Sequence, residues 1–174
     1  DQFDHIDLGQ LLGSVPGIYI REEDGFGLRP NIGIRGATSD RSQKITIMED
    51  GVLITPAPYS APAAYYVPNA SRVHTIEVLK GASAIQHGPH TVGGSLNFVS
   101  APIPDKGIVE IDLSRGTDSF YKYQLAAGKK YGDFGILLDG LVYGSDGFKS
   151  LDGGGDTGFL RSDLGLKVSW RPQT

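Results

Sequence analysis

Three side chains able to take part in catalysis or metal binding lie close together in the sequence: Ser83, His87 and His90. Ser83 is not part of a Gly-x-Ser-x-Gly motif and has no identifiable base near it, so a hydrolase nucleophile is not supported. Zinc sites use roughly three or four protein ligands, and two histidines without a third ligand nearby are a weak signal. We therefore interpret Gly88-Pro89, which separates the histidines, as a turn.

Asp152 and Asp156 flank three consecutive glycines and are candidate calcium ligands. Calcium takes roughly six to eight oxygen ligands, which this short segment does not supply, so we interpret the segment as an open loop. The chain has no cysteine, which excludes thiolate catalysis, disulfides and cysteine-ligated zinc. We expect no catalytic residue, no metal site and no cofactor, and hence a protein that is not an enzyme.

The segment 81–99 is the most informative part of the chain because glycine recurs in it at Gly81, Gly88, Gly93 and Gly94. Neither a GxxxxGK[ST] nor a GxGxxG motif occurs there, so a nucleotide-binding loop is not indicated. Repeated glycine means that the backbone needs positive φ or close approach at several points. The pattern predicts a strand that ends at Gly81, a short helical turn, two tight bends and a second strand from Ser95.

Composition limits the class of protein further. The chain has 174 residues and a net charge of −4, which argues against nucleic-acid binding. It has no apolar run of about 18 residues, so no membrane-spanning helix is expected. The 25 glycines favour a turn-rich β architecture over a helical one. Because Asp1 is not an initiator methionine, we expect the chain to begin as a processed or trimmed product.

The chain divides near Pro104, since every proline except Pro172 lies at or before that position. Before this boundary, apolar residues at Leu8, Leu11, Leu12 and Val15 predict a short amphipathic helix. Short strands are predicted at 18–20, 32–35 and 73–79, with a stiff, proline-rich loop at 55–68. Asp50-Gly51 predicts a hairpin between strands at 44–49 and 52–54.

After the boundary, apolar and polar residues alternate over segments of about ten residues, as in transmembrane β-barrels. A soluble sheet with one face on a core produces the same alternation, and by pattern alone it is favoured because such sheets are more common. The connections are short at 115–118 and 129–133 and long at 145–159. If the first strand rises from the periplasm, the long connection faces outward, as barrels require.

Six motifs then follow in a specific order. They are Leu-Leu-Gly-Ser-Val-Pro-Gly-Ile (11–18), Asn-Ile-Gly-Ile-Arg-Gly (31–36), Met-Glu-Asp-Gly-Val (48–52), Ala-Pro-Tyr (57–59), Ile-Glu-Val-Leu-Lys-Gly (76–81) and Gly-Pro-His-Thr-Val-Gly-Gly-Ser-Leu-Asn-Phe-Val (88–99). Together they resemble the plug domain of TonB-dependent outer-membrane receptors. Ala-Pro-Tyr and the glycine motif at 88–94 most resemble the ferric-citrate receptor branch.

The resemblance implies an α+β plug domain, with a small mixed β-sheet and short helices, at 1–104. It implies that 105–174 forms the first four antiparallel strands of a truncated transmembrane β-barrel. The expected function is TonB-energised uptake of a ferric chelate across the bacterial outer membrane. Expected partners are the remaining barrel strands, outer-membrane lipid, the chelate and TonB, which would contact a segment before Asp1.

Two alternatives to a ferric-chelate receptor stay open. The same architecture serves other cargo, such as a nickel chelate, haem, cobalamin or an oligosaccharide. A secreted β-rich interaction module would instead fold as a soluble monomer from these residues alone.

The resemblance also implies site residues. Basic residues at the positions of Arg35 and Lys80 face carboxylates of the barrel wall and latch the plug. Lys80 stands where arginine is usual, and lysine does not form the same bidentate pair. The ligand is expected to contact two loops near 24–29 and 58–62, through Phe26, Arg29, Tyr59, Ser60 and Ala61. Phe26 and Ala61 replace the small polar side chains of the citrate-binding branch.

Overall fold

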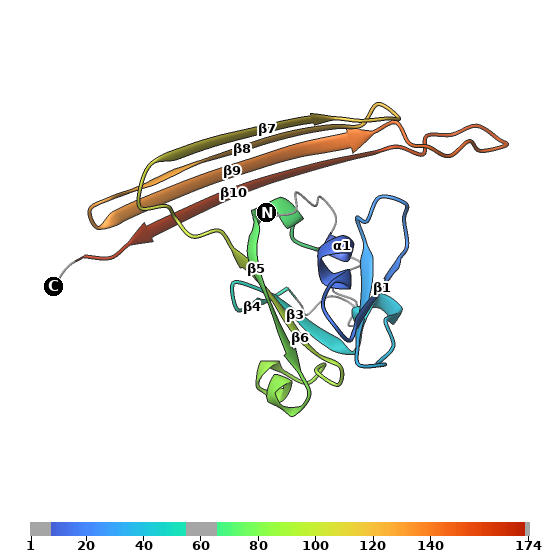
Figure 1. Cartoon of the computed structure of the whole chain (residues 1–174), viewed down its shortest axis with the longest axis horizontal. Helices are drawn as coiled ribbons and strands as arrows, with labels where there is room; N and C mark the ends of the chain where they lie inside the picture. The colour runs from blue at the N-terminus through green and yellow to red at the C-terminus, as the bar shows by residue number, and fades with distance from the viewer. Residues whose placement is uncertain (1–7, 55–65, 173–174) are drawn as a thin grey trace. The chain divides into compact units, whose positions relative to one another are not determined.

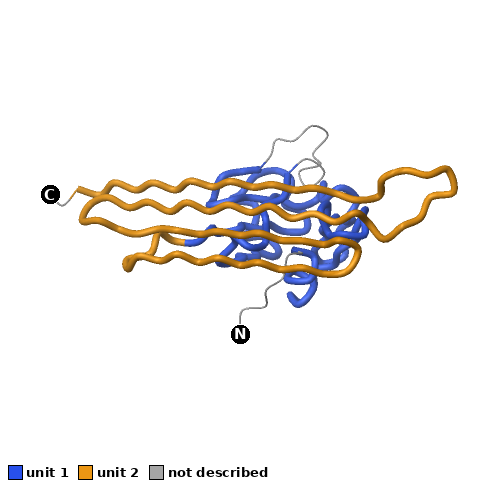
Figure 2. Tube along the Cα trace, turned by 90° about the horizontal axis from the view of Figure 1, so that it is seen from above, with its two compact units in different colours: residues 1–101 blue, residues 102–174 orange. Residues whose placement is uncertain are grey.

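The structure is a computed structural model that describes residues 8–54 and 66–172. The chain forms two compact units, Asp1–Ala101 and Pro102–Thr174, coloured separately in Figure 2. The elements of the first unit are α1 (Leu8–Gly13), β1 (Ile18–Glu22), β2 (Pro30–Ile34), η1 (Asp40–Ser42), β3 (Ile45–Glu49), β4 (Val52–Leu53), η4 (Ala70–Arg72), β5 (Val73–Lys80), η5 (Ala82–His87) and β6 (Gly94–Ser100). The second unit contains β7 (Ile108–Arg115), β8 (Tyr121–Tyr131), β9 (Phe134–Ser145) and β10 (Phe159–Trp170).

The first unit is built on a small mixed sheet with the strand order β4-β3-β6-β5 (Figure 1). Strands β3 and β6 are parallel, which places Ile45 beside Gly94, although the two residues are far apart in the sequence. The other two pairings are antiparallel. Beside this sheet, β1 and β2 form a separate antiparallel hairpin in which Ile18 pairs with Ile34.

One apolar core joins α1, the hairpin and the mixed sheet. Its buried members are Leu8, Leu12, Ile18, Ile32, Ile34, Ile45, Ile47, Val67, Ala70, Leu96 and Phe98. Leu8 and Leu12 are one helical turn apart, so α1 presents both of them to this core. Burial of these side chains is the main favourable contribution to the stability of the unit.

The predicted helix and hairpin are confirmed. Asp50 and Gly51 have φ values of 48° and 78°, the left-handed values that a two-residue hairpin turn needs. One predicted boundary is wrong, because β2 ends at Ile34 and does not include Arg35. Arg35 and Gly36 have φ values of 52° and 78°, so the chain leaves the extended conformation at this point.

The second unit is an antiparallel meander with the order β10-β9-β8-β7. Its register places side chains from all four strands in rows across the sheet, such as Ile111, Leu125, Gly140 and Leu164. Because strand side chains alternate between faces, the sheet has an apolar face and a polar face. The apolar face consists of exposed side chains, namely Val109, Ile111, Leu113, Tyr123, Leu125, Tyr131, Phe134, Ile136, Leu138, Val142, Leu160, Leu164, Leu166, Val168 and Trp170.

The polar face carries most of the charged residues of these strands. They are Glu110, Asp112, Lys122, Lys130, Asp139, Arg161, Asp163 and Lys167. Lys122 is buried, and its Nζ lies 2.9 Å from Oδ2 of Asp112. The alternation predicted for this part of the chain is therefore confirmed.

Candidate functional site

Two cationic side chains predicted to act together, Arg35 and Lys80, lie at one corner of the first unit. Lys80 ends β5 and pairs with Gly94, whose neighbour on the other side is Ile45. A Cβ placed on Gly94 would lie 3.3 Å from Cδ1 of Ile34, the residue before Arg35. The parallel pairing of β3 with β6 therefore brings the ends of β2 and β5 together.

Gly81 provides the surface on which the Arg35 guanidinium lies. A Cβ on Gly81 would be 2.9 Å from Nη1 of Arg35, closer than side chains pack. Gly81 also has φ 86° and ψ −155°, a conformation that is essentially restricted to glycine. The corner thus requires glycine for two reasons, space for the guanidinium and backbone conformation.

Both residues also hold the turn that follows α1, Lys80 through its side chain and Arg35 through its backbone. The Lys80 ammonium donates a hydrogen bond to the carbonyl oxygen of Pro16. The backbone N–H of Arg35 donates to the Gly17 carbonyl oxygen at 2.9 Å. Two positive charges at one corner repel each other. A negatively charged group placed there would offset this repulsion, so the corner favours an anionic partner.

The loop between β1 and β2 holds two predicted ligand contacts at the opposite end of β2. Asp24 organises this loop, since its Oδ1 accepts hydrogen bonds from the N–H groups of Phe26 at 2.8 Å and Leu28 at 3.1 Å. Oδ2 of the same carboxylate is buried and has no hydrogen-bond partner in the described part of the chain. Phe26 is half-buried, whereas Arg29 is exposed and accessible to an anion.

Sequence reasoning did not single out Asp24, although the Asp-Gly-Phe-Gly order was a usable signal. Aspartate commonly accepts hydrogen bonds from the backbone two residues further on, and glycine tolerates the turn. Gly27 indeed has a φ of 70°. The other predicted ligand contacts, Tyr59, Ser60 and Ala61, lie outside the described residues.

A second polar cluster, also missed from sequence, lies at the Asp50-Gly51 hairpin. Arg72 forms a salt bridge with Glu49, whose Oε2 accepts a hydrogen bond from the Tyr66 hydroxyl at 2.8 Å. Asp50 accepts from the N–H of Ser100 at 2.8 Å, which joins the hairpin to the end of β6. The Ser100 hydroxyl also donates a hydrogen bond to Oδ2 of Asp50 at 2.5 Å. Because these side chains are engaged in joining the hairpin to β6, we assign the cluster a structural role.

The other residues considered for chemistry do not form a metal-ligand group in the described part of the chain. Within 8–54 and 66–172, no three histidine, cysteine or acidic side chains group as metal ligands would. His87 closes η5, with its Nε2 buried and unpartnered, whereas His90 is exposed after Gly88-Pro89. Asp156 accepts a hydrogen bond from the N–H of Gly158 at 2.7 Å, as expected for a loop residue.

The apolar face of the second unit ends in aromatic side chains. Tyr131, Phe134 and Trp170 form one row at the end where β8 turns into β9. Tyr121 and Tyr123 lie toward the other end, with ring centres 5.5 Å apart. None of the described helices has the length and apolar character needed to cross a membrane.

Comparison with known proteins identifies relatives of the chain. A model of the family described as TonB-dependent Receptor Plug Domain matches residues 1–95. Vitamin B12 transporter BtuB of Photobacterium profundum is 27% identical over 144 residues, which are 82% of this chain and 23% of the transporter. The chain therefore spans about a quarter of the length of this relative.

Solved structures share the fold at lower identity. The siderophore receptor PirA from Acinetobacter baumannii has a TM-score of 0.69 and 19% identity, covering 96% of this chain and 27% of the receptor. The ferric yersiniabactin uptake receptor FyuA from Yersinia pestis has a TM-score of 0.72 and 21% identity, covering 92% of this chain and 25% of the receptor. The named relatives are transporters and receptors, not enzymes.

Proposed function

Because the chain belongs to the TonB-dependent receptor plug family, we propose that it forms the plug and first wall strands of an outer-membrane receptor that imports a metal chelate. In this proposal, residues 1–104 are the plug and 105–174 are the first four strands of a transmembrane β-barrel. The observation that carries the proposal is the presence, in one chain, of the plug match and a sheet with an exposed apolar face.

The dimensions of the apolar face support a position in a membrane. Leu160 and Trp170 delimit this face along β10 and are separated by ten residue steps. At about 3.3 Å a step and a tilt of about 35–45°, these steps span about 23–27 Å along the membrane normal. Outer-membrane barrels have an apolar band of about 25 Å bordered by aromatic residues, which is the pattern seen here.

The cargo that we propose is a ferric chelate, with ferric citrate as the specific candidate from the motif resemblance. Arg29 is exposed on the loop held by Asp24 and would form charge-assisted hydrogen bonds with an anionic chelate. Phe26 would contact the apolar parts of the ligand. Tyr59, Ser60 and Ala61 complete the proposed ligand contacts from the second loop.

Cobalamin is the second candidate cargo. The identity of 27% with a vitamin B12 transporter over most of this chain favours it. Phe26 and Ala61, which stand where the citrate-binding branch has small polar residues, also fit a less polar ligand than citrate. The two candidate cargoes therefore differ in how much Arg29 would contribute to binding. Its contribution would be larger for ferric citrate, a small anion, than for cobalamin.

Arg35 and Lys80 are proposed to latch the plug against carboxylates of the barrel wall. Arg35 is exposed and Lys80 is half-buried in the described part of the chain. Enclosing these two cations in a barrel lumen without anionic partners would cost several kcal/mol, which supports wall carboxylates as their partners. TonB is the proposed energy source for moving the plug. The proposal is thus a gated pathway in which this corner holds the closed state.

Uptake by the full-length receptor tests the proposal. A strain lacking the receptor gene would be supplied with labelled ferric citrate, other ferric chelates and labelled cobalamin, with and without TonB. We expect TonB-dependent uptake of one cargo, reduced at least fivefold by Arg29→Ala if that cargo is anionic. The matched control is Arg41→Ala, which removes an exposed cation from η1. Equal uptake by the deletion strain and the complemented strain would overturn the proposal.

A further inference from the structure

Two cations lie on the otherwise uncharged apolar face of the β7–β10 sheet, one toward each end, and each contacts a tyrosine. Nη2 of Arg115 donates a hydrogen bond to the Tyr123 hydroxyl at 3.0 Å. Nζ of Lys129 lies 4.7 Å from the centre of the Tyr131 ring. Tyrosine next to a cation at the border of an apolar surface is typical of membrane interfaces, where the cation reaches the headgroups.

Charge on this face is unbalanced. The carboxylates of β7–β10, all of which are described, are Glu110, Asp112, Asp139 and Asp163. The alternation of side chains along each strand places all four on the polar face, where Asp112 pairs with the buried Lys122. No strand carboxylate is therefore available to Lys129 on its own face. The complementary group for this ammonium is an anion supplied from outside the sheet.

The surroundings of Lys129 leave its ammonium accessible. Its neighbour toward β7 is Gly107, where a Cβ would lie 3.3 Å from Cδ of Lys129, so the alkyl stem crosses a glycine. Its neighbour toward β9 is Ile136. Tyr131 and Trp170, one row further along, are 64% and 67% exposed and border the apolar face. A phosphate at this border would meet a cation and aromatic rings together.

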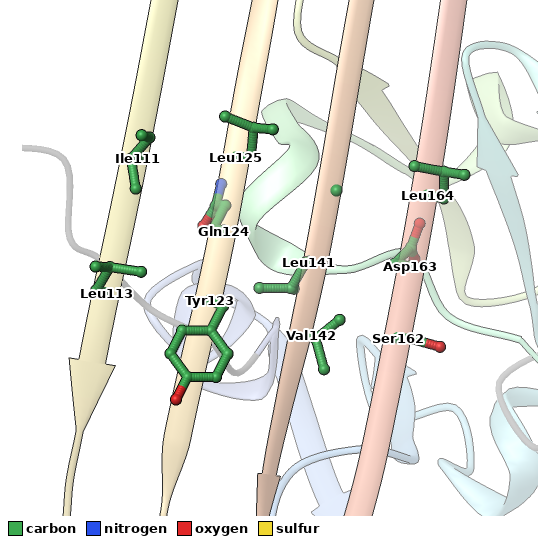
Figure 3. A pocket seen from close by; sticks show the side chains of 11 residues that line it. Ile111, Leu113, Tyr123, Gln124, Leu125, Leu141, Val142, Ser162, Asp163 and Leu164 are labelled. Atoms are coloured by element: carbon green, nitrogen blue, oxygen red, sulfur yellow. The ribbon is translucent and has the colours of Figure 1, made fainter.

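The same face has an apolar hollow of about 730 Å³ further along the strands (Figure 3). Gly140 forms its floor between Leu125 and Leu164, and a Cβ there would meet only Cδ1 of Leu164, at 3.7 Å. Four residue steps separate Lys129 from Leu125, or about 13 Å along β8. At a tilt of about 35–45°, this length is about 9–11 Å along the membrane normal, which lies within the half-thickness of about 15 Å of a bilayer hydrocarbon core.

From these relationships we infer that the sheet holds one phospholipid, with its phosphate on Lys129 beside Tyr131 and an acyl chain over the Gly140 hollow. The inference rests on the proposed membrane position of the sheet. Charge complementarity selects an anionic headgroup, and the separation between cation and hollow fits within one leaflet. The occupant is thus a lipid of the leaflet at the end of the sheet where β8 turns into β9.

The test is native mass spectrometry of the full-length receptor, titrated in detergent with phosphatidylglycerol carrying chains of 16 or 6 carbons. One lysine near a lipid phosphate contributes about 1 kcal/mol, so Lys129→Gln should weaken binding of both lipids about fivefold. Lys129→Arg should retain binding. The matched control is Lys130→Gln, which removes the adjacent lysine, paired with Asp105 at 2.5 Å. Gly140→Leu should weaken binding of the long-chain lipid only.

Several outcomes would overturn the inference. The inference would be wrong if the Lys129→Gln receptor bound the lipid as tightly as the wild type. It would also be wrong if inorganic phosphate displaced the lipid. If the receptor were found as a dimer without bound lipid, a second copy of the receptor would be the occupant of the hollow. Recovery of each variant in the outer-membrane fraction, with unchanged heat-modified gel mobility, checks folding. If the receptor is absent from that fraction, the proposed function is contradicted. If the variants are present there and bind the lipid as the wild type does, only the lipid site is contradicted.

Discussion

The Lys80 ammonium donates its hydrogen bond to the carbonyl oxygen of Pro16, a residue 64 positions earlier in the chain. This bond fastens the end of β5 to the turn after α1. Arg35 holds the next residue of that turn through its backbone N–H, at 2.9 Å from the Gly17 carbonyl oxygen. Residues proposed to latch the plug therefore also hold the turn after α1 in place.

Lys80→Met is expected to loosen this turn. A hydrogen bond from a partly exposed ammonium contributes about 1 kcal/mol, so amide exchange in the segment 15–20 should accelerate about fivefold. Hydrogen–deuterium exchange of the full-length receptor measures this. Lys44→Met, at an exposed lysine just before β3, is the control and should leave exchange in that segment unchanged. Equal rates in both variants would show that the bond does not restrain the turn.

Gly81→Ala is expected to destabilise the plug by about 1–3 kcal/mol, because it forces a non-glycine residue into a conformation with φ 86°. The new methyl group would also displace the Arg35 guanidinium, 2.9 Å away. Faster amide exchange over 76–84 would report the loss. Gly13→Ala is the control, since a Cβ there meets nothing within 4 Å. A neutral Gly81→Ala would contradict the assigned role of this glycine.

Asp24 is expected to control ligand affinity through the loop that it holds. Asp24→Ala removes the acceptor of two backbone hydrogen bonds, at a cost of about 1–2 kcal/mol, which corresponds to about 5- to 30-fold weaker binding. Asp24→Asn keeps an acceptor at the same position and should bind within about twofold of the wild type. Equilibrium binding of the labelled cargo distinguishes the two variants. If both lose affinity equally, the carboxylate charge matters rather than the loop geometry.

The effect of Leu164→Lys on stability distinguishes a membrane-embedded sheet from a soluble one. Leu164 is 78% exposed in the Gly140 row, near mid-height of the apolar face. In a membrane, Leu164→Lys should cost about 2–4 kcal/mol and Leu160→Lys, at the border, about 0–1 kcal/mol. Urea unfolding of the receptor in lipid vesicles measures both. Improved solubility and unchanged stability for Leu164→Lys would instead favour the soluble module.

Asp105 makes a pH-dependent contribution to stability. The hydrogen bond from Lys130, followed by the charge of that lysine, lowers the pKa of Asp105 below its usual value of 3.8. Because the folded-state pKa is lowered, the stabilisation is fully present above about pH 4 and is lost as pH falls through the folded pKa. Carboxyl NMR titration should detect the lowered pKa, and Lys130→Met should restore it to near 3.8. An unchanged titration in Lys130→Met would exclude this pairing.

Local sequence determined the elements and the faces of this protein. Asp50-Gly51 specifies a two-residue turn because both residues tolerate positive φ. Side chains alternate between the two faces of a strand, so the sequence also assigns each strand residue to a face. The helix at Leu8–Gly13 and the two faces of β7–β10 therefore follow from neighbours in the chain. The strand predicted at 32–35 ends one residue early, because Arg35 takes a left-handed conformation that its type does not favour.

Tertiary structure alone decided which distant residues meet. The parallel pairing of β3 with β6 and the register of β5 bring Lys80 to Pro16 and Gly81 to Arg35. The salt bridge of Glu49 with Arg72 depends on the same sheet. Such contacts cannot be read from sequence spacing, because they are set by strand order and crossover rather than by the periodicity of any one segment.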